Sequence, residues 1–254
     1  ADIWSGISSS YPGSIMDAIL VGDTLYFSAN DGNSGHELWA HDTSNASTWR
    51  VADIRSGTSS SYLGQYMEIL VGDTLYFDAN DGSSGTELWA HDTSNASTWR
   101  VTDINSGAGN SNPGQYMEIL VGDTLYFSAT DRSSDHELWA HDTSNASTWQ
   151  VADINSGWAG SNPGSNLHIL VGDTIYFSAN DGNSGHELWA HDTSNASTWQ
   201  VADIWSGISS SYPGSIMDAI LVGDTLYFSA NDGSSGYELW AHDTSNASTW
   251  RVAD

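Results

Sequence analysis

The sequence predicts an all-β protein, a five-bladed β-propeller with four antiparallel strands in each blade. The tetrapeptide Val-Gly-Asp-Thr recurs five times, at intervals of 50, 50, 50 and 51 residues. Each interval contains four short runs of strand-forming residues separated by turn-forming residues, and no run has helical periodicity. We therefore expect a single propeller domain over residues 1–254, built from five repeats of about fifty residues.

The second repeat illustrates the expected strands. Its apolar and β-branched runs are separated by glycine, asparagine, aspartate and serine, which favour turns. The middle strands are apolar on both faces, as in Leu75-Tyr76-Phe77, and this is typical of blades that pack against neighbours on both sides. The expected strands are Tyr66 to Val71, Thr74 to Ala79, Glu87 to His91 and Thr98 to Ile104.

A right-handed β-solenoid is the main structural alternative, but its coils usually have about 20 to 30 residues, so a fifty-residue unit fits a blade better. The loop from Asn105 to Gly114 would carry the chain from the outer strand of one blade to the inner strand of the next. In a closed monomeric propeller, Ala1 and Asp254 would lie close together at the outer edge.

Charge limits the possible partners of this chain. It has 32 acidic residues against five arginines and no lysine, which gives a formal net charge of -27. Nucleic acid is excluded as a partner, because its binding needs clustered cations, whereas divalent cations and neutral sugars are compatible with this charge. The 13 tryptophans and 11 tyrosines argue for a folded chain rather than a disordered one. No apolar run is long enough to insert into a membrane.

Each repeat contains three segments in a fixed order. In the first repeat they are Tyr26-Phe27-Ser28-Ala29-Asn30-Asp31-Gly32, Gly35-His36-Glu37-Leu38-Trp39 and Ala52-Asp53-Ile54. This pattern resembles the bacterial ELW-x-x-DGT repeat family of large secreted or surface proteins. The chain departs from that family at Asp42-Thr43-Ser44, where the family has Asp-Gly-Thr. The resemblance implies a propeller, an extracellular or cell-surface location, and a binding or adhesion role.

The turn after the second strand of each repeat is a candidate calcium site. Its alternate residues in the first repeat, Asp31, Asn33 and Glu37, offer oxygen atoms at the spacing of a calcium-binding loop. The alternative is that Asp-Gly forms a hairpin turn and the glutamate hydrogen-bonds neighbouring backbone. The corresponding candidates in other repeats are Asp81 and Glu87, and Asp181, Asn183 and Glu187.

A second group of candidate metal ligands lies on the innermost strands. If Ala18 and Ala219 form one-residue bulges, five side chains occupy equivalent positions and face the central channel. Four carboxylates and a histidine at close range would need a cation or raised pKa values. The alternative is a water-filled channel mouth with solvated carboxylates. These residues are Asp17, Glu68, Glu118, His168 and Asp218.

Repeat symmetry argues against an enzyme. A glycosidase needs two carboxyl groups in different environments, and near-identical blades do not provide them. The repeated His41-Asp42 pair lacks a nucleophile, and adjacent strand residues point to opposite faces. The sequon at Asn45 and its four copies mark glycosylation sites or Asx turns.

The loops that connect the repeats vary most and carry aromatic residues beside serine and asparagine. Aromatic rings stack on sugars while short polar groups hydrogen-bond the hydroxyls, which predicts a secreted, lectin-like propeller that binds glycans or cell-surface polysaccharide at several sites. The alternative is an ion-stabilised structural or adhesion module of a larger surface protein, in which the aromatics fill clefts between blades. The candidate ligand-binding residues are Trp4, Tyr11, Tyr62, Trp158, Trp205 and Tyr212.

Overall fold

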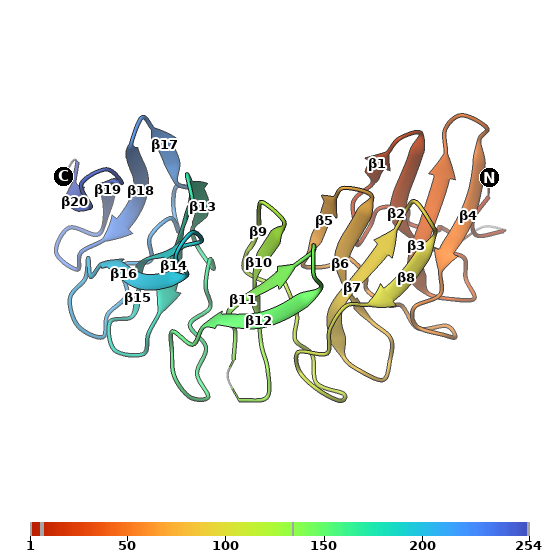
Figure 1. Ribbon diagram of the computed structural model, residues 1–254, viewed down its shortest axis with the longest axis horizontal. Helices are drawn as coiled ribbons and strands as arrows, with labels where there is room; N and C mark the ends of the chain where they lie inside the picture. The colour runs from red at the N-terminus through yellow and green to blue at the C-terminus, as the bar shows by residue number, and fades with distance from the viewer. Residues whose placement is uncertain (1, 6–7, 134, 253–254) are drawn as a thin grey trace. The chain divides into compact units, whose positions relative to one another are not determined.

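The computed structural model describes residues 2–5, 8–133 and 135–252. Within them, the strands form five sheets of four antiparallel strands, and in every sheet the spatial order follows the chain (Figure 1). The predicted five-bladed, all-β propeller architecture is confirmed. Ala1 and Asp254, whose proximity the sequence predicted, lie outside the described residues. No helix among the described residues is long and apolar enough to cross a membrane.

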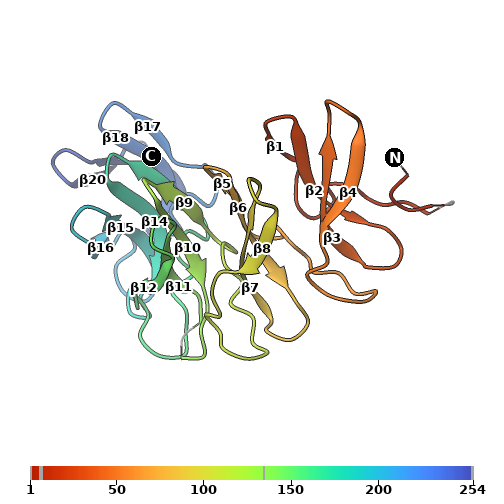
Figure 2. The ribbon, with the colours of Figure 1, turned by 45° about the vertical axis from the view of Figure 1, so that its right-hand side comes forward.

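The chain divides into two compact units, one comprising residues 1–115 and 130–132 and the other residues 116–129 and 133–254. The first unit contains two blades (Figure 2). Their strands are β1 (Ile19–Val21), β2 (Thr24–Asn30), β3 (His36–Asp42) and β4 (Ser47–Ala52), followed by β5 (Glu68–Val71), β6 (Thr74–Asn80), β7 (Thr86–Asp92) and β8 (Ser97–Arg100).

The second unit contains the sheets of the other three blades. Their strands are β9 (Glu118–Val121), β10 (Thr124–Ala129), β11 (Glu137–Asp142) and β12 (Ser147–Ala152); β13 (His168–Val171), β14 (Thr174–Asn180), β15 (His186–Asp192) and β16 (Ser197–Ala202); and β17 (Ile220–Val222), β18 (Thr225–Asn231), β19 (Tyr237–Asp243) and β20 (Ser248–Arg251).

Tight turns fix the register of each blade. Val21 pairs with Thr24, which leaves Gly22 and Asp23 as a two-residue hairpin turn. Gly22 has a φ of 59°, and glycine at the first central position of such a turn is typical of a type II′ turn, whose twist matches that of the strands. The Val-Gly-Asp-Thr repeat is therefore the inner hairpin of every blade.

Two strands of the second blade are shorter than predicted, for a common reason. Tyr66 and Met67 donate their backbone N–H groups to the side chain of Asp78, so β5 begins only at Glu68. At the other end, β8 ends at Arg100, and Ile104 donates its N–H to the carboxylate of Glu87. Side chains therefore bind backbone N–H groups at both ends.

Apolar contacts between adjacent sheets form the core. In the first unit, Tyr26, Leu38 and Ala40 pack in one cluster with Leu75 and Phe77 of the next sheet. The second unit repeats this arrangement twice, between its first and second sheets and between its second and third. In the second, third and fourth blades, β6, β10 and β14 are buried almost throughout, as their continuous apolar sequence predicts.

Candidate ligand-binding loops

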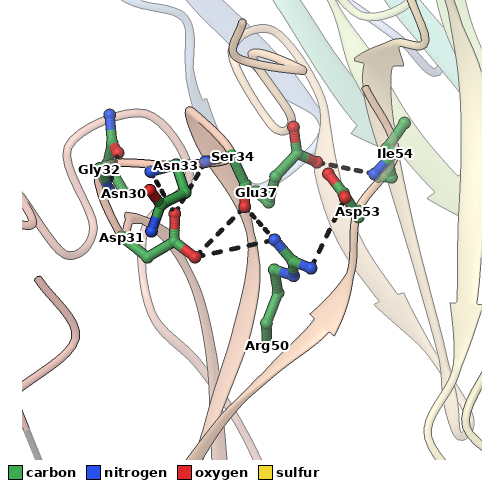
Figure 3. A network of polar contacts seen from close by, with 9 residues as sticks. All are labelled: Asn30, Asp31, Gly32, Asn33, Ser34, Glu37, Arg50, Asp53 and Ile54. Atoms are coloured by element: carbon green, nitrogen blue, oxygen red, sulfur yellow. Dashed lines mark hydrogen bonds and ion pairs between the residues drawn. The ribbon is translucent and has the colours of Figure 1, made fainter. Parts of the chain in front are cut away.

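The turn between β2 and β3 is held by its own aspartate. Asp31 Oδ1 accepts hydrogen bonds from the N–H groups of Asn33, at 2.9 Å, and Ser34, at 2.8 Å. Its other oxygen lies 3.7 Å from the guanidinium of Arg50, which also contacts Ser34 (Figure 3). Although burial raises the pKa of Asp31, these hydrogen bonds and the arginine charge leave it below the usual value.

Glu37 points away from this turn. Its Oε2 accepts the N–H of Ile54 at 2.8 Å and its Oε1 accepts the N–H of Ser61 at 3.2 Å (Figure 3 shows the first contact). The side chain is fully buried, and burial raises its pKa to about 7 despite these hydrogen bonds. The equivalent glutamates of three other blades are also buried, and burial raises the pKa of each to about 7. These residues are Glu87, Glu137 and Glu187.

The predicted calcium ligands of the turn therefore do not converge. Asp81 and Asp181 repeat the contacts of Asp31 with the two following N–H groups, while Glu87 and Glu187 bind the next inter-blade segment. Asn33 and Asn183 donate their backbone N–H groups to these aspartates. Among the described residues, no group of three or more His, Cys, Asp or Glu side chains is placed to hold a metal ion. Calcium binding stays a prediction.

Four of the five predicted axial residues come together in two pairs. In the first unit, the backbone N–H of Asp17 donates to Glu68 at 3.0 Å, and burial raises the pKa of Glu68. In the second unit, His168 and Asp218 line one hollow of about 300 Å³. Glu118 begins β9, where it pairs with Phe127. The strands β1 and β17 have three residues rather than four and begin after Ala18 and Ala219, so Asp17 and Asp218 precede the innermost strands instead of lying on them.

The six candidate aromatic residues fall into two groups. Trp4 and Trp205 lie half-buried against the Asp-Gly turns: a Cβ added to Gly32 would be 2.5 Å from the Trp4 ring, and one added to Gly233 would be 2.3 Å from Trp205. Glycine is required there because the indole lies directly against its Cα. These two tryptophans are therefore packed against the scaffold on one side.

Tyr11, Tyr62 and Tyr212, by contrast, are 60%, 50% and 41% exposed, and they have left-handed backbone conformations with φ of 46°, 53° and 47°. The equivalent residues of the other two blades, Asn112 and Asn162, have the same conformation, with φ of 44° and 48°. Asparagine adopts this region readily, whereas a bulky side chain there is strained. Trp158, in the loop before Asn162, is 87% exposed.

The repeated His-Asp pair has separate structural roles. His41 Nδ1 lies 2.7 Å from Thr48 Oγ1, while Asp42 accepts hydrogen bonds from Ser44 and from Asn45 Nδ2. The same contacts recur in the other blades. Asn45 Oδ1 also accepts the N–H of Ser47, so the sequon asparagines form the Asx turns that were one of the two predicted alternatives.

Asp78 is a residue that the sequence analysis did not single out. It takes the place of a serine in the other blades and is fully buried. Its Oδ1 accepts the N–H groups of Tyr66 and Met67, but its Oδ2 is buried without a hydrogen-bond partner. Burial raises the pKa of Asp78 to about 7. The sequence did contain a signal for this residue: Asp78 is the one acidic residue at a strand position where the other repeats have serine.

Comparisons with known proteins support the fold. No family model matches the chain, and no curated protein matches it. It is similar to the structure of puromycin hydrolase, in the S511A mutant complexed with PGG, with a TM-score of 0.57 and 14% identity over 93% of this chain and 37% of that one. It also resembles the Niastella koreensis GH74 enzyme, with a TM-score of 0.51 and 15% identity over 99% of this chain and 38% of that one.

A structure of prolyl endopeptidases gives a TM-score of 0.55 with 12% identity, covering 97% of this chain and 37% of that one. The chain thus spans well under half the length of each of these neighbours. At such identities the likeness shows the fold alone: this chain has the blade architecture that the larger proteins also contain.

Proposed function

We propose that the protein is a secreted, multivalent binding propeller whose exposed loop tyrosines bind neutral glycans. The observation that carries this proposal is the strained and exposed state of Tyr11, Tyr62 and Tyr212. A left-handed conformation costs a bulky residue roughly 1–2 kcal/mol. Asn112 and Asn162 fill the same position without this strain, so the fold itself does not call for tyrosine there.

The chemistry of the surroundings supports a sugar as the ligand. A tyrosine ring offers an apolar face and a phenolic hydroxyl, a combination that suits the alternating C–H and O–H groups of a sugar. Serine and glycine dominate the loops that precede these rings. The net charge of -27 disfavours anionic ligands, which leaves neutral glycans as the favoured class. Trp158 supplies an exposed ring to the loop of the fourth blade.

The proposal is tested by glycan binding with variants that copy residues from the chain's own repeats. Wild-type protein is applied to an array of neutral oligosaccharides and compared with the double variant Tyr62→Asn and Tyr212→Asn. Each substitution installs the residue that Asn112 and Asn162 already place in the same conformation. We expect the variant to keep its circular dichroism, to melt at a higher temperature because the backbone strain is relieved, and to lose roughly 1–3 kcal/mol of binding free energy per site.

The reciprocal variants Asn112→Tyr and Asn162→Tyr are expected to strengthen binding. Normal binding by the double asparagine variant would contradict the proposal, because the tyrosines would then not be the platform. Absence of binding to every neutral glycan on the array would favour the alternative, a structural or adhesion module without a small ligand.

A further inference from the structure

In each of the first four blades, the carboxylate of a buried glutamate binds both ends of the variable loop that follows that blade. In the fourth blade, Glu187 Oε2 accepts the N–H of Ile204 at 2.8 Å, and Oε1 accepts the N–H of Ser211 at 2.9 Å. The hydroxyl of Ser211 adds a third bond to Oε2, at 2.6 Å. Residues 205–210 therefore form a loop whose two ends bind one side chain.

The same arrangement recurs in the first three blades. The carboxylate accepts a backbone N–H 17 residues further along the chain at 2.8 Å in each case, and it also binds a serine 24 residues further along. Each serine belongs to the end of a variable loop. The pairs are Glu37 with Ser61, Glu87 with Ser111, and Glu137 with Ser161.

The clamped serine directly precedes the residue in the left-handed conformation. Ser211 is followed by Tyr212, whose N–H donates to His186 O at 3.1 Å. The Tyr212 ring stacks on the His186 ring, with centroids 5.4 Å apart and planes at 21°. Because Glu187 follows His186 in β15, one short stretch of strand fixes both the loop end and one face of the tyrosine ring.

We propose that two of these glutamates are positioning residues for the ligand sites at the ends of the loops that they clamp: Glu187 for Tyr212, and Glu37 for Tyr62. This inference rests on the proposed function. A six-residue loop with glycine and serine would otherwise sample many conformations, and ordering it on binding would weaken affinity. The buried carboxylate orders the loop in advance, so the ring is already in place when the ligand arrives.

The test uses the two tyrosine sites as internal controls for each other. Glu187→Gln keeps the size of the side chain but sets an NH₂ group against an N–H donor of Ser211 or Ile204. Binding of the neutral oligosaccharide with the strongest array signal is followed at each site by NMR of labelled tyrosines. We expect about a tenfold loss of affinity at Tyr212 and no change at Tyr62. Glu37→Gln should give the mirror image.

A change of the same size at both sites, or at neither, would overturn the inference. Ser211→Ala, which removes only the hydroxyl contact, should give a smaller loss at the same site, and it carries the test if Glu187→Gln does not fold. Amide hydrogen exchange separates this inference from the proposed function, since it needs no ligand. The amide to follow is that of Ile204, which donates to Glu187, because the Ser211 N–H also donates to His186 O at 3.0 Å. Exchange at Ile204 should accelerate in Glu187→Gln while Ile54, which donates to Glu37, stays unchanged. Equal protection of Ile204 in both proteins would refute the clamp even if glycans bind.

Discussion

We expect Asp78→Ser to stabilise the protein at neutral pH and to leave its stability nearly unchanged in acid. The substitution installs the residue that the other blades carry, where Ser28 accepts the N–H of Met16 at 3.1 Å and donates to Met16 O. In the wild type, Asp78 Oδ2 is buried without a partner, so an ionised carboxylate there lacks solvation. The protonated acid can donate a hydrogen bond as serine does.

The size of the effect follows from the pKa of Asp78, which burial raises from 3.8 to about 7. Below about pH 4 the carboxyl is protonated in both the folded and the unfolded chain, and it costs no stability. Between about pH 4 and 7 only the unfolded chain loses the proton, so each pH unit removes about 1.4 kcal/mol. Above pH 7 the cost is complete, about 4 kcal/mol as an order of magnitude.

Urea unfolding followed by tryptophan fluorescence at pH 4.5 and pH 8 measures this difference, because the chain has 13 tryptophans. The matched control is Ser178→Asp, which places a carboxyl at the same strand position in the fourth blade, where Ser178 is fully buried and accepts the N–H of Asn166. It should destabilise the protein at pH 8 far more than at pH 4.5. Equal effects of Asp78→Ser at the two pH values, or a harmless Ser178→Asp at pH 8, would refute the reasoning.

Three further predictions concern the scaffold. The four buried glutamates also have a pKa of about 7, so the Asp78→Ser protein should still lose stability as the pH rises from about 4.5 to 7, and a flat pH profile would contradict this. Gly185→Ala should strongly destabilise the protein, because the added Cβ would lie 2.4 Å from Ser209 O. The control is Gly172→Ala, where φ is also positive but the Cβ would meet open space, so the expected loss is only roughly 1 kcal/mol. Similar urea midpoints for the two variants would count against the close contact. Raising NaCl should increase the melting temperature by screening the net charge, and CaCl₂ at matched ionic strength should raise it further if the predicted calcium sites form; equal midpoints in the two salts would count against those sites.

The sequence was sufficient to predict the blade architecture, because the fifty-residue period and the turn residues each constrain it independently. Turns separate the strands as predicted, and the apolar middle strands contribute to the core. The strand ends were less predictable. Glu87 and Asp78 accept hydrogen bonds from the N–H groups of Ile104 and Tyr66, which the sequence analysis had placed in strands. Such contacts depend on where a distant side chain lies, and the local sequence does not show this.

The site was predictable only in outline. The variable loops and their tyrosines were identified, but conformation separated Tyr11, Tyr62 and Tyr212 from the packed Trp4 and Trp205. A positive φ at a tyrosine carries no local sequence signal, except that asparagine occupies the same position in two other repeats. The calcium-like spacing of the Asp-Gly turn was open to two interpretations, and the sequence could not show that Asp31 and Glu37 bind backbone N–H groups in different directions.

The most direct test of the account counts bound ligands. Isothermal titration or native mass spectrometry with the neutral oligosaccharide that binds best gives the number of sites per chain in the wild type and in the Asn112→Tyr, Asn162→Tyr double variant. Because both positions already have the left-handed conformation, at φ of 44° and 48°, the variant should gain one site for each added tyrosine. An unchanged number of sites in a variant that folds normally would contradict the claim that the exposed tyrosines bind the ligand.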